Sequence, residues 1–352
     1  MVLALIATSC VSDGSSTISD VYTGTASHGD LVTFRINKTD QIYQVNNHTA
    51  NQTASASYGV MTGLLGNVYK TFSETSSLYA VELDGVVLAT NFPTGNSENK
   101  ISFGITTAIN NTGRESLIAG DYIYIRFGSE EINGSLKNKE WGVISVLPSG
   151  TLYTKAYASG GDQGQNGLPP LTPDKFNLSL PLTSGDLQGS WSVNSTEKVK
   201  LDVEINGVQY TAFSYAATSS SVFLLDLGAG NGYILGLKVS PASISLAQLV
   251  GSYNFVGVVA DGTGLAGNTR IASDGSATCA IETNGVLSED ESFTGIQQCP
   301  NLPNVLCATH LDPRYPSYRG KAYFVISGDI MMYFIFDTDG FFNAYGAGVK
   351  IM

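Results

Sequence analysis

The chain has 352 residues, enough for two domains with separate cores, and its formal net charge is −12. Only 14% of its residues are charged, and Lys and Arg together number 18. Binding to nucleic acid or to an anionic membrane surface requires clustered basic residues, so this composition argues against both. No apolar run reaches the length of about 18 residues that a membrane-spanning helix needs.

The first residues are apolar, then small, and end in Cys10. This order resembles the end of a bacterial lipoprotein signal, which implies that Cys10 is lipidated and that residues 1–16 form a leader, lipobox and tether. The resemblance places the protein in the cell envelope or outside the cell, anchored by lipid to the outer membrane or in the periplasm. The alternative is a frayed apolar terminus of a protein that is not exported.

Strand patterns follow along the whole chain. From Val199 to Asn206, apolar and polar residues alternate, and Asn206-Gly207 is a preferred type I′ hairpin turn. A small residue next to an aromatic opens several strand runs, at 22–26, 119–122, 188–191 and 250–253. This recurrence predicts an internal duplication of about 170 residues, each copy holding two related units. Convergence between unrelated meanders is the alternative.

The predicted fold class is all-β, with two tandem antiparallel meander barrels and very little helix. Sandwiches are the second choice, because either arrangement hides strand edges. We expect a first β domain over 17–160, a Gly- and Pro-rich linker over 161–175 and a second β domain over 176–352. One short helix is expected within 240–247, where Ser240 would cap and Pro241 would take the first position.

A helical turn before a Gly-x-Trp strand is how calycin barrels begin. Gly189-Ser190-Trp191 fits that tripeptide, and the turn at 240–247 precedes Gly251-Ser252-Tyr253. The chain therefore resembles lipocalin-like barrels over these few residues. The aromatics predicted to fill the barrels or to contact a ligand are Trp141, Trp191, Tyr122 and Tyr253.

Cys279, Cys299 and Cys307 lie close together in the sequence, and an exported protein can form disulfides. Bridges of Cys299 to Cys307, or of either one to Cys279, are all open. A metal site is not expected, because the CxxC spacing of a zinc site is missing. No cofactor is expected either.

Catalytic motifs such as GxSxG, a Walker loop or HExxH do not occur in the sequence. The histidines, His28, His48 and His310, are expected to be solvated loop residues. The stretch 330–336 is apolar without alternation, which predicts either a strand covered on both faces or an assembly surface presenting Met332 and Phe334.

The leading functional hypothesis is a non-catalytic, exported, lipid-anchored binding protein for a small apolar ligand or a protein partner. The second is a structural or adhesive subunit that forms homo-oligomers through strand edges. The third is a hydrolase with an unrecognised site.

Overall fold

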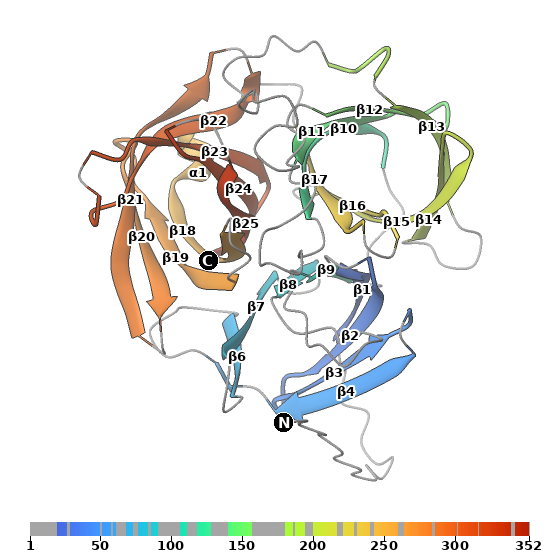
Figure 1. Ribbon diagram of the computed structural model, residues 1–352, viewed down its shortest axis with the longest axis horizontal. Helices are drawn as coiled ribbons and strands as arrows, with labels where there is room; N and C mark the ends of the chain where they lie inside the picture. The colour runs from blue at the N-terminus through green and yellow to red at the C-terminus, as the bar shows by residue number, and fades with distance from the viewer. Residues whose placement is uncertain are drawn as a thin grey trace.

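The computed structural model describes residues 20–26, 29–49, 51–57, 59–60, 68–72, 77–83, 86–90, 106–110, 118–127, 140–156, 180–185, 187–193, 200–216, 221–228, 231–239, 243–259, 264–283, 286–300, 302–315, 317–338 and 342–351. These residues form three antiparallel sheets in chain order (Figure 1): an open nine-stranded sheet followed by two closed eight-stranded barrels. The predicted pair of tandem all-β barrels is confirmed. In the described residues, no helix is long and apolar enough to cross a membrane.

The first sheet contains β1 Asp20–Ala26, β2 Leu31–Asn37, β3 Ile42–Asn47, β4 Gln52–Ser57, β5 Gly59–Val60, β6 Val68–Phe72, β7 Ser77–Leu83, β8 Val87–Thr90 and β9 Thr106–Asn110. Its first strand pairs with its last, as in a barrel. β4 pairs with β3, β5 pairs with β6, and β4 and β5 occupy the two edges of the sheet. The sheet is therefore a meander that starts to close but stays open between β4 and β5 in the described residues.

The first barrel contains β10 Gly120–Phe127, β11 Glu140–Val146, β12 Thr151–Ala156, β13 Leu187–Val193, β14 Lys200–Ile205, β15 Val208–Ala216, β16 Ser221–Asp226 and β17 Tyr233–Lys238. The predicted domain boundary at 161–175 is wrong. Residues 161–175 themselves lie outside the described part, but β12 and β13 on either side of them pair within this barrel. The predicted hairpin turn at Asn206-Gly207 is present, with both residues at positive φ.

The second barrel contains β18 Gly251–Val259, β19 Gly264–Ile271, β20 Ala277–Thr283, β21 Val286–Cys299, β22 Leu302–Leu311, β23 Gly320–Ser327, β24 Ile330–Phe336 and β25 Phe342–Ile351. The short helix α1, Leu246–Leu249, precedes it. It begins later than predicted and is capped by Ser245, whose N–H donates to the Gln248 side chain at 2.7 Å. Ser240 and Pro241 lie outside the described residues.

The two barrels share the same opening geometry. Gly120 and Gly251 begin their first strands at φ +153° and +144°, a conformation that other residues rarely adopt, and the side chains of Lys238 and Lys350 from the last strands lie against them. Lys238 Nζ donates to the Ala119 carbonyl at 2.6 Å. The repeat therefore relates barrel to barrel. The predicted duplication of about 170 residues had the wrong boundaries, because 188–191 lies on β13 in mid-barrel.

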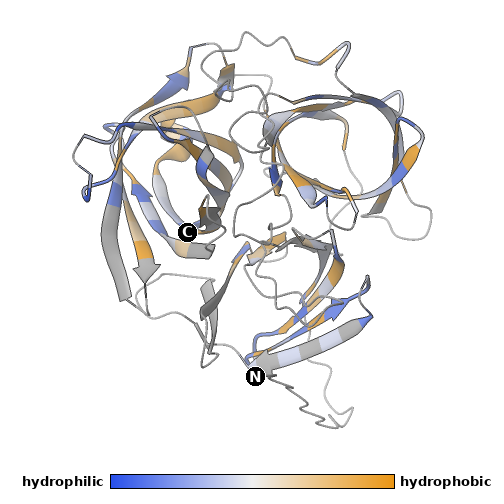
Figure 2. Ribbon diagram, viewed as in Figure 1, coloured by the Kyte–Doolittle hydropathy of each residue, from blue (hydrophilic) through white to orange (hydrophobic). Residues whose placement is uncertain are grey.

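A hydrophobic core between the three sheets holds them together. It collects outward-facing residues of both barrels and residues of β7 and β8, and Figure 2 shows hydrophobic residues on strands of all three sheets. Every residue of β24 is buried, because Tyr333 and its alternate neighbours point into the second barrel while Met332 and Phe334 point into this core. The strand is thus covered on both faces, and the prediction of Met332 and Phe334 as an assembly surface is wrong.

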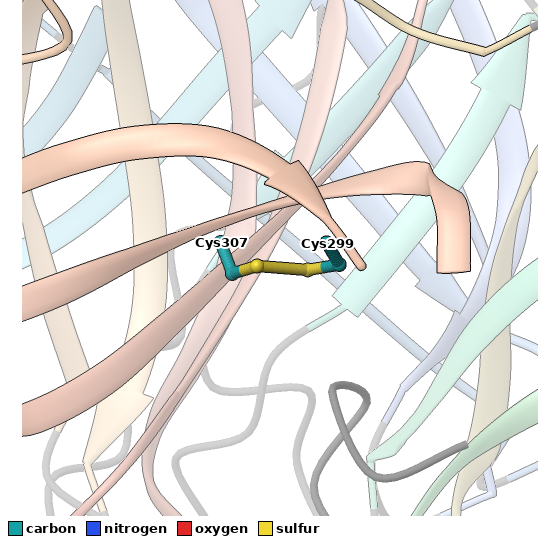
Figure 3. The surroundings of a disulfide bond; sticks show 2 residues. All are labelled: Cys299 and Cys307. Atoms are coloured by element: carbon teal, nitrogen blue, oxygen red, sulfur yellow. A yellow bond between two sulfur atoms is a disulfide. The ribbon is translucent and has the colours of Figure 1, made fainter. Parts of the chain in front are cut away.

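Cys299 and Cys307 form a disulfide between β21 and β22, with their Cα atoms 5.3 Å apart (Figure 3). Both contact the core between the sheets. Cys279 lies inside the second barrel instead. Of the alternatives that the spacing left open, the Cys299–Cys307 bridge is the one observed.

The first sheet meets the first barrel at a buried carboxyl group. The Thr25 hydroxyl donates to Asp226 at 3.3 Å, and the Gly228 N–H donates to the same oxygen at 3.0 Å. Burial raises the pKa of Asp226 to about 6, and the charge of Asp30 adds to this effect. The folded state therefore favours the protonated form of Asp226.

We predict that Phe334→Ala lowers the free energy of unfolding by about 3–5 kcal/mol, because it leaves a cavity in the core between the sheets. Phe334 is fully buried and stacks on Trp141 and Tyr323 at centroid distances of 5.9 and 5.5 Å. Chemical denaturation measures the change. Val208→Ala, at a position 51% exposed, is the control and should cost less than about 0.5 kcal/mol. A Phe334→Ala protein as stable as the wild type contradicts the prediction.

We predict that Asp226→Asn changes how stability depends on pH. Since the pKa of Asp226 is raised from 3.8 to about 6 on folding, this carboxyl contributes stability below about pH 4 that is lost as the pH rises through 6. The difference in unfolding free energy between wild type and Asp226→Asn should therefore fall across this window. Asp274→Asn is the control, because hydrogen bonds from Ser276 lower the pKa of Asp274 and move its effect below pH 4. If the difference in unfolding free energy between the two proteins stays constant from pH 4 to 7, the pKa of Asp226 is not raised on folding.

Candidate functional site

The second barrel encloses a cavity of about 40 Å³. Strands from most of the barrel contribute to its wall, so its shape depends on barrel closure. Its polar lining residues are Thr269, Cys279, Glu291, His310, Tyr333 and Asn343. Its aromatic and aliphatic lining includes Phe255, Phe293, Phe324, Met331 and Ile335. A cavity with mostly apolar walls and a few polar groups is the general form of a small-ligand site.

A buried His–Glu pair forms one side of the cavity. His310 Nε2 lies 2.9 Å from Glu291 Oε2, and His310 is only 1% exposed. The pairing of β20, β21 and β22 creates this contact, since Cys279 lies opposite Glu291 and Phe293 lies opposite His310. The other ring nitrogen of His310, Nδ1, is buried without a hydrogen-bond partner. The prediction of His310 as a solvated loop residue is wrong, because it lies on the inward face of β22.

Two aromatic rings fix the imidazole. Phe293 stacks on His310 at 5.1 Å between centroids, and Tyr318 meets it edge-on at 5.3 Å. The Tyr318 hydroxyl accepts a hydrogen bond from Asn343 Nδ2 at 3.2 Å. Burial raises the pKa of Tyr318 to about 12, so its hydroxyl stays protonated at neutral pH. The imidazole is therefore held in one orientation, with Nε2 toward Glu291.

A second buried polar atom lies in the same wall. The Tyr333 hydroxyl has no hydrogen-bond partner, and burial raises the pKa of Tyr333 well above its ordinary value, with the nearby Cys279 and Glu291 acting in the same direction. The hydroxyl therefore stays protonated. A buried polar group without a partner costs about 1–3 kcal/mol, and His310 Nδ1 and the Tyr333 hydroxyl both carry this cost.

The outer end of the site carries an ion pair from the β22–β23 connection. Arg314 donates to both carboxylate oxygens of Asp312 at 2.9 Å, and its guanidinium lies 3.8 Å from Glu291. The hydrogen bond from Arg314 lowers the pKa of Asp312. Arg314 is 63% exposed, so its attraction for Glu291 is screened by water.

The first barrel provides an internal comparison for these polar positions. Tyr122 and Tyr253 occupy equivalent positions on the first strands of the two barrels. Tyr122 pairs with Ile144 and Tyr253 pairs with Thr269, so Ile144 is the equivalent of Thr269. The same comparison places Ile205 at the position of His310 and Leu225 at the position of Tyr333. All three aliphatic residues are buried inside the first barrel. At these three positions, the second barrel is polar where the first barrel is aliphatic.

The predicted aromatics do not meet at one site. Tyr122 and Tyr253 each fill the interior of their own barrel, Trp141 packs between the sheets, and Trp191 donates its indole N–H to the Leu147 carbonyl at 3.0 Å. Cys10 and His28 lie outside the described residues. His48 contacts the Thr33 hydroxyl at 2.8 Å in an exposed position.

The cavity residues Glu291, His310 and Tyr333 were missed by sequence reasoning. His310 shares its strand face with Leu306 and Ala308, which is the one signal that could have placed it inside. In the described residues, no group of three or more His, Cys, Asp or Glu side chains is arranged to hold a metal ion.

No protein-family model and no curated protein matches the chain. Among solved structures, it is similar to a protein of unknown function from the DUF3598 family of Nostoc punctiforme, with 10% identity and a TM-score of 0.21 over 66% of this chain and 96% of that one. It is also similar to transferrin binding protein B of Haemophilus parasuis, with 10% identity and a TM-score of 0.31. Transferrin binding protein B of Neisseria meningitidis is similar as well, with 14% identity and a TM-score of 0.29. Both matches cover 92% of this chain, which spans 66% of each of those chains.

Proposed function

We propose that the protein is a non-catalytic binding protein of the cell envelope, anchored through Cys10, whose second barrel holds a small ligand. The observation that supports this most is a difference between two matched barrels at equivalent inward positions. His310 and Tyr333 line a cavity, whereas Ile205 and Leu225 fill the same positions of the first barrel. The anchor and location rest on the sequence around Cys10.

The cavity size limits the ligand. A cavity needs a volume of about 10–15 Å³ to hold one water molecule, and an engineered cavity of about 150 Å³ binds benzene. A cavity of about 40 Å³ therefore accepts a group of a few heavy atoms. The ligand is a small molecule, or the small end of a larger one, with both an apolar part and a polar group.

A second candidate function is assembly through strand edges. The two barrels are closed, but the first sheet ends in β4 and β5, so β4 offers backbone groups for an added strand. This function requires oligomers whose proportion rises with concentration. Light scattering after gel filtration that shows one monomer mass across the micromolar range would exclude self-assembly.

We predict that Ala344→Leu closes the cavity, because Ala344 lines it and is only 6% exposed. Cys279 also lines the cavity, so a small reagent such as methyl methanethiosulfonate should reach its thiol in the native wild type. Peptide mass mapping should show modification of Cys279 at least about tenfold slower in Ala344→Leu, since buried thiols without access are inert.

Two controls complete this experiment. Thr211→Leu, at a partly exposed position of the first barrel, adds apolar bulk away from the cavity and should leave the rate unchanged. The wild-type protein at increasing reagent size should lose reactivity once the reagent exceeds a few heavy atoms. A wild-type Cys279 that reacts only on unfolding would show that nothing enters the cavity, which would overturn the proposed function.

A further inference from the structure

We propose that the group which enters the second-barrel cavity is a protonated amine. This inference rests on the proposed function, because it names the class of ligand for the same site. It depends on a match between the hydrogen-bond acceptors, the charge and the aromatic rings around one small volume.

The first element of the match is a buried acceptor. A carboxylate only accepts hydrogen bonds, so the 2.9 Å contact with Glu291 makes His310 Nε2 the donor. In the neutral imidazole, the other nitrogen then carries a lone pair. This Nδ1 is buried, has no hydrogen-bond partner, and belongs to a residue that lines the cavity. A ligand that satisfies it must bring a donor.

The second element is the Tyr333 hydroxyl, which is also buried without a hydrogen-bond partner and belongs to a residue that lines the cavity. A hydroxyl oxygen accepts hydrogen bonds as well as donating one. An ammonium group carries several N–H donors, so it has enough of them for both His310 Nδ1 and the Tyr333 hydroxyl. A molecule without donors would leave the imidazole nitrogen unsatisfied and would gain nothing from it.

The third element is charge. Glu291 lines the cavity and is 16% exposed as a side chain, so its carboxylate acts in a poorly solvated place. Arg314 offsets it only from 3.8 Å on the solvent side. The protein as a whole carries a net charge of −12, which draws cations toward it. An anionic ligand group would meet repulsion from Glu291.

The aromatic walls complete the match. Phe255 meets Tyr333 edge-on at 5.5 Å, and Phe293 meets Phe324 edge-on at the same centroid distance. Aromatic rings attract cations at their faces, and their carbon surface accepts the methylene groups of an alkyl chain. A short alkylammonium ion, or the ammonium end of a longer molecule, therefore fits both the polar and the apolar lining.

Isothermal titration at pH 7 on the full chain tests this with three probes of nearly equal size: n-propylammonium, n-propanol and propionate. We expect n-propylammonium to bind at least about tenfold more tightly than either of the others, because its hydrogen bonds are charge-assisted. Nα-acetyl-lysine amide is the fourth probe. Tighter binding of this probe identifies the ligand as the end of a longer molecule, and weaker binding identifies it as a free amine.

Substitutions assign the effect to the named groups. Glu291→Gln keeps the shape and removes the charge, and we expect it to weaken n-propylammonium binding about tenfold or more. His310→Ile and Tyr333→Leu install the first barrel's residues and should abolish the preference for the amine. The controls are Glu204→Gln, an exposed residue on β14, and Tyr323→Phe in the core between the sheets.

The outcomes separate the two proposals. If n-propanol binds the wild type as well as n-propylammonium does, the amine inference is wrong while the small-ligand function stands. If no probe binds and Cys279 is also unreactive in the native state, both are wrong. The wild-type series decides between amine, alcohol and acid without any variant, so a substitution that fails to fold leaves the test intact.

Discussion

The structure depends on burying strands on both faces at once. A barrel normally hides one face of each strand, but here the outward faces of both barrels are also apolar where they meet each other and the first sheet. β24 is the extreme case, with all of its residues buried. Such a strand is stable only when the neighbouring sheets cover it, since the exposed face would otherwise leave a large apolar patch in water. The three sheets therefore form one body.

The same strands position the candidate site. On β24, Phe334 packs between the sheets and the adjacent Tyr333 reaches the cavity. On β21 and β22, the Cys299–Cys307 disulfide contacts the core between the sheets, while Glu291 and His310 face into the barrel. Alternation along a strand ties each inner residue to an outer neighbour, so packing between the sheets limits how far the cavity wall can move.

Much of the local structure could be predicted from the sequence, because it depends on neighbours in the chain. The alternation from Val199 to Asn206 and the Asn206-Gly207 turn gave a hairpin in the right place. The domain boundary could not be predicted this way. A Gly- and Pro-rich stretch between strands has the same composition whether it links domains or joins β12 to β13 within a barrel, and only pairing between distant strands separates the two cases. The closure of each barrel by its first and last strands is likewise a non-local contact.

The site was harder to predict than the fold for the same reason. Cys279, Glu291 and His310 come from three neighbouring strands, and the pairing register that aligns them shifts at a bulge beside Cys279. The matched barrels give the strongest argument that this set has a role. Aliphatic residues at these positions, such as Ile144, Ile205 and Leu225, carry no polar side-chain atom that needs a partner. Placing His310 and Tyr333 there instead costs folding free energy, because a buried polar group without a hydrogen bond has lost its water and gained nothing. A bound molecule that donates hydrogen bonds to them would return that free energy, and this is the physical basis of the ligand binding proposed for the second barrel.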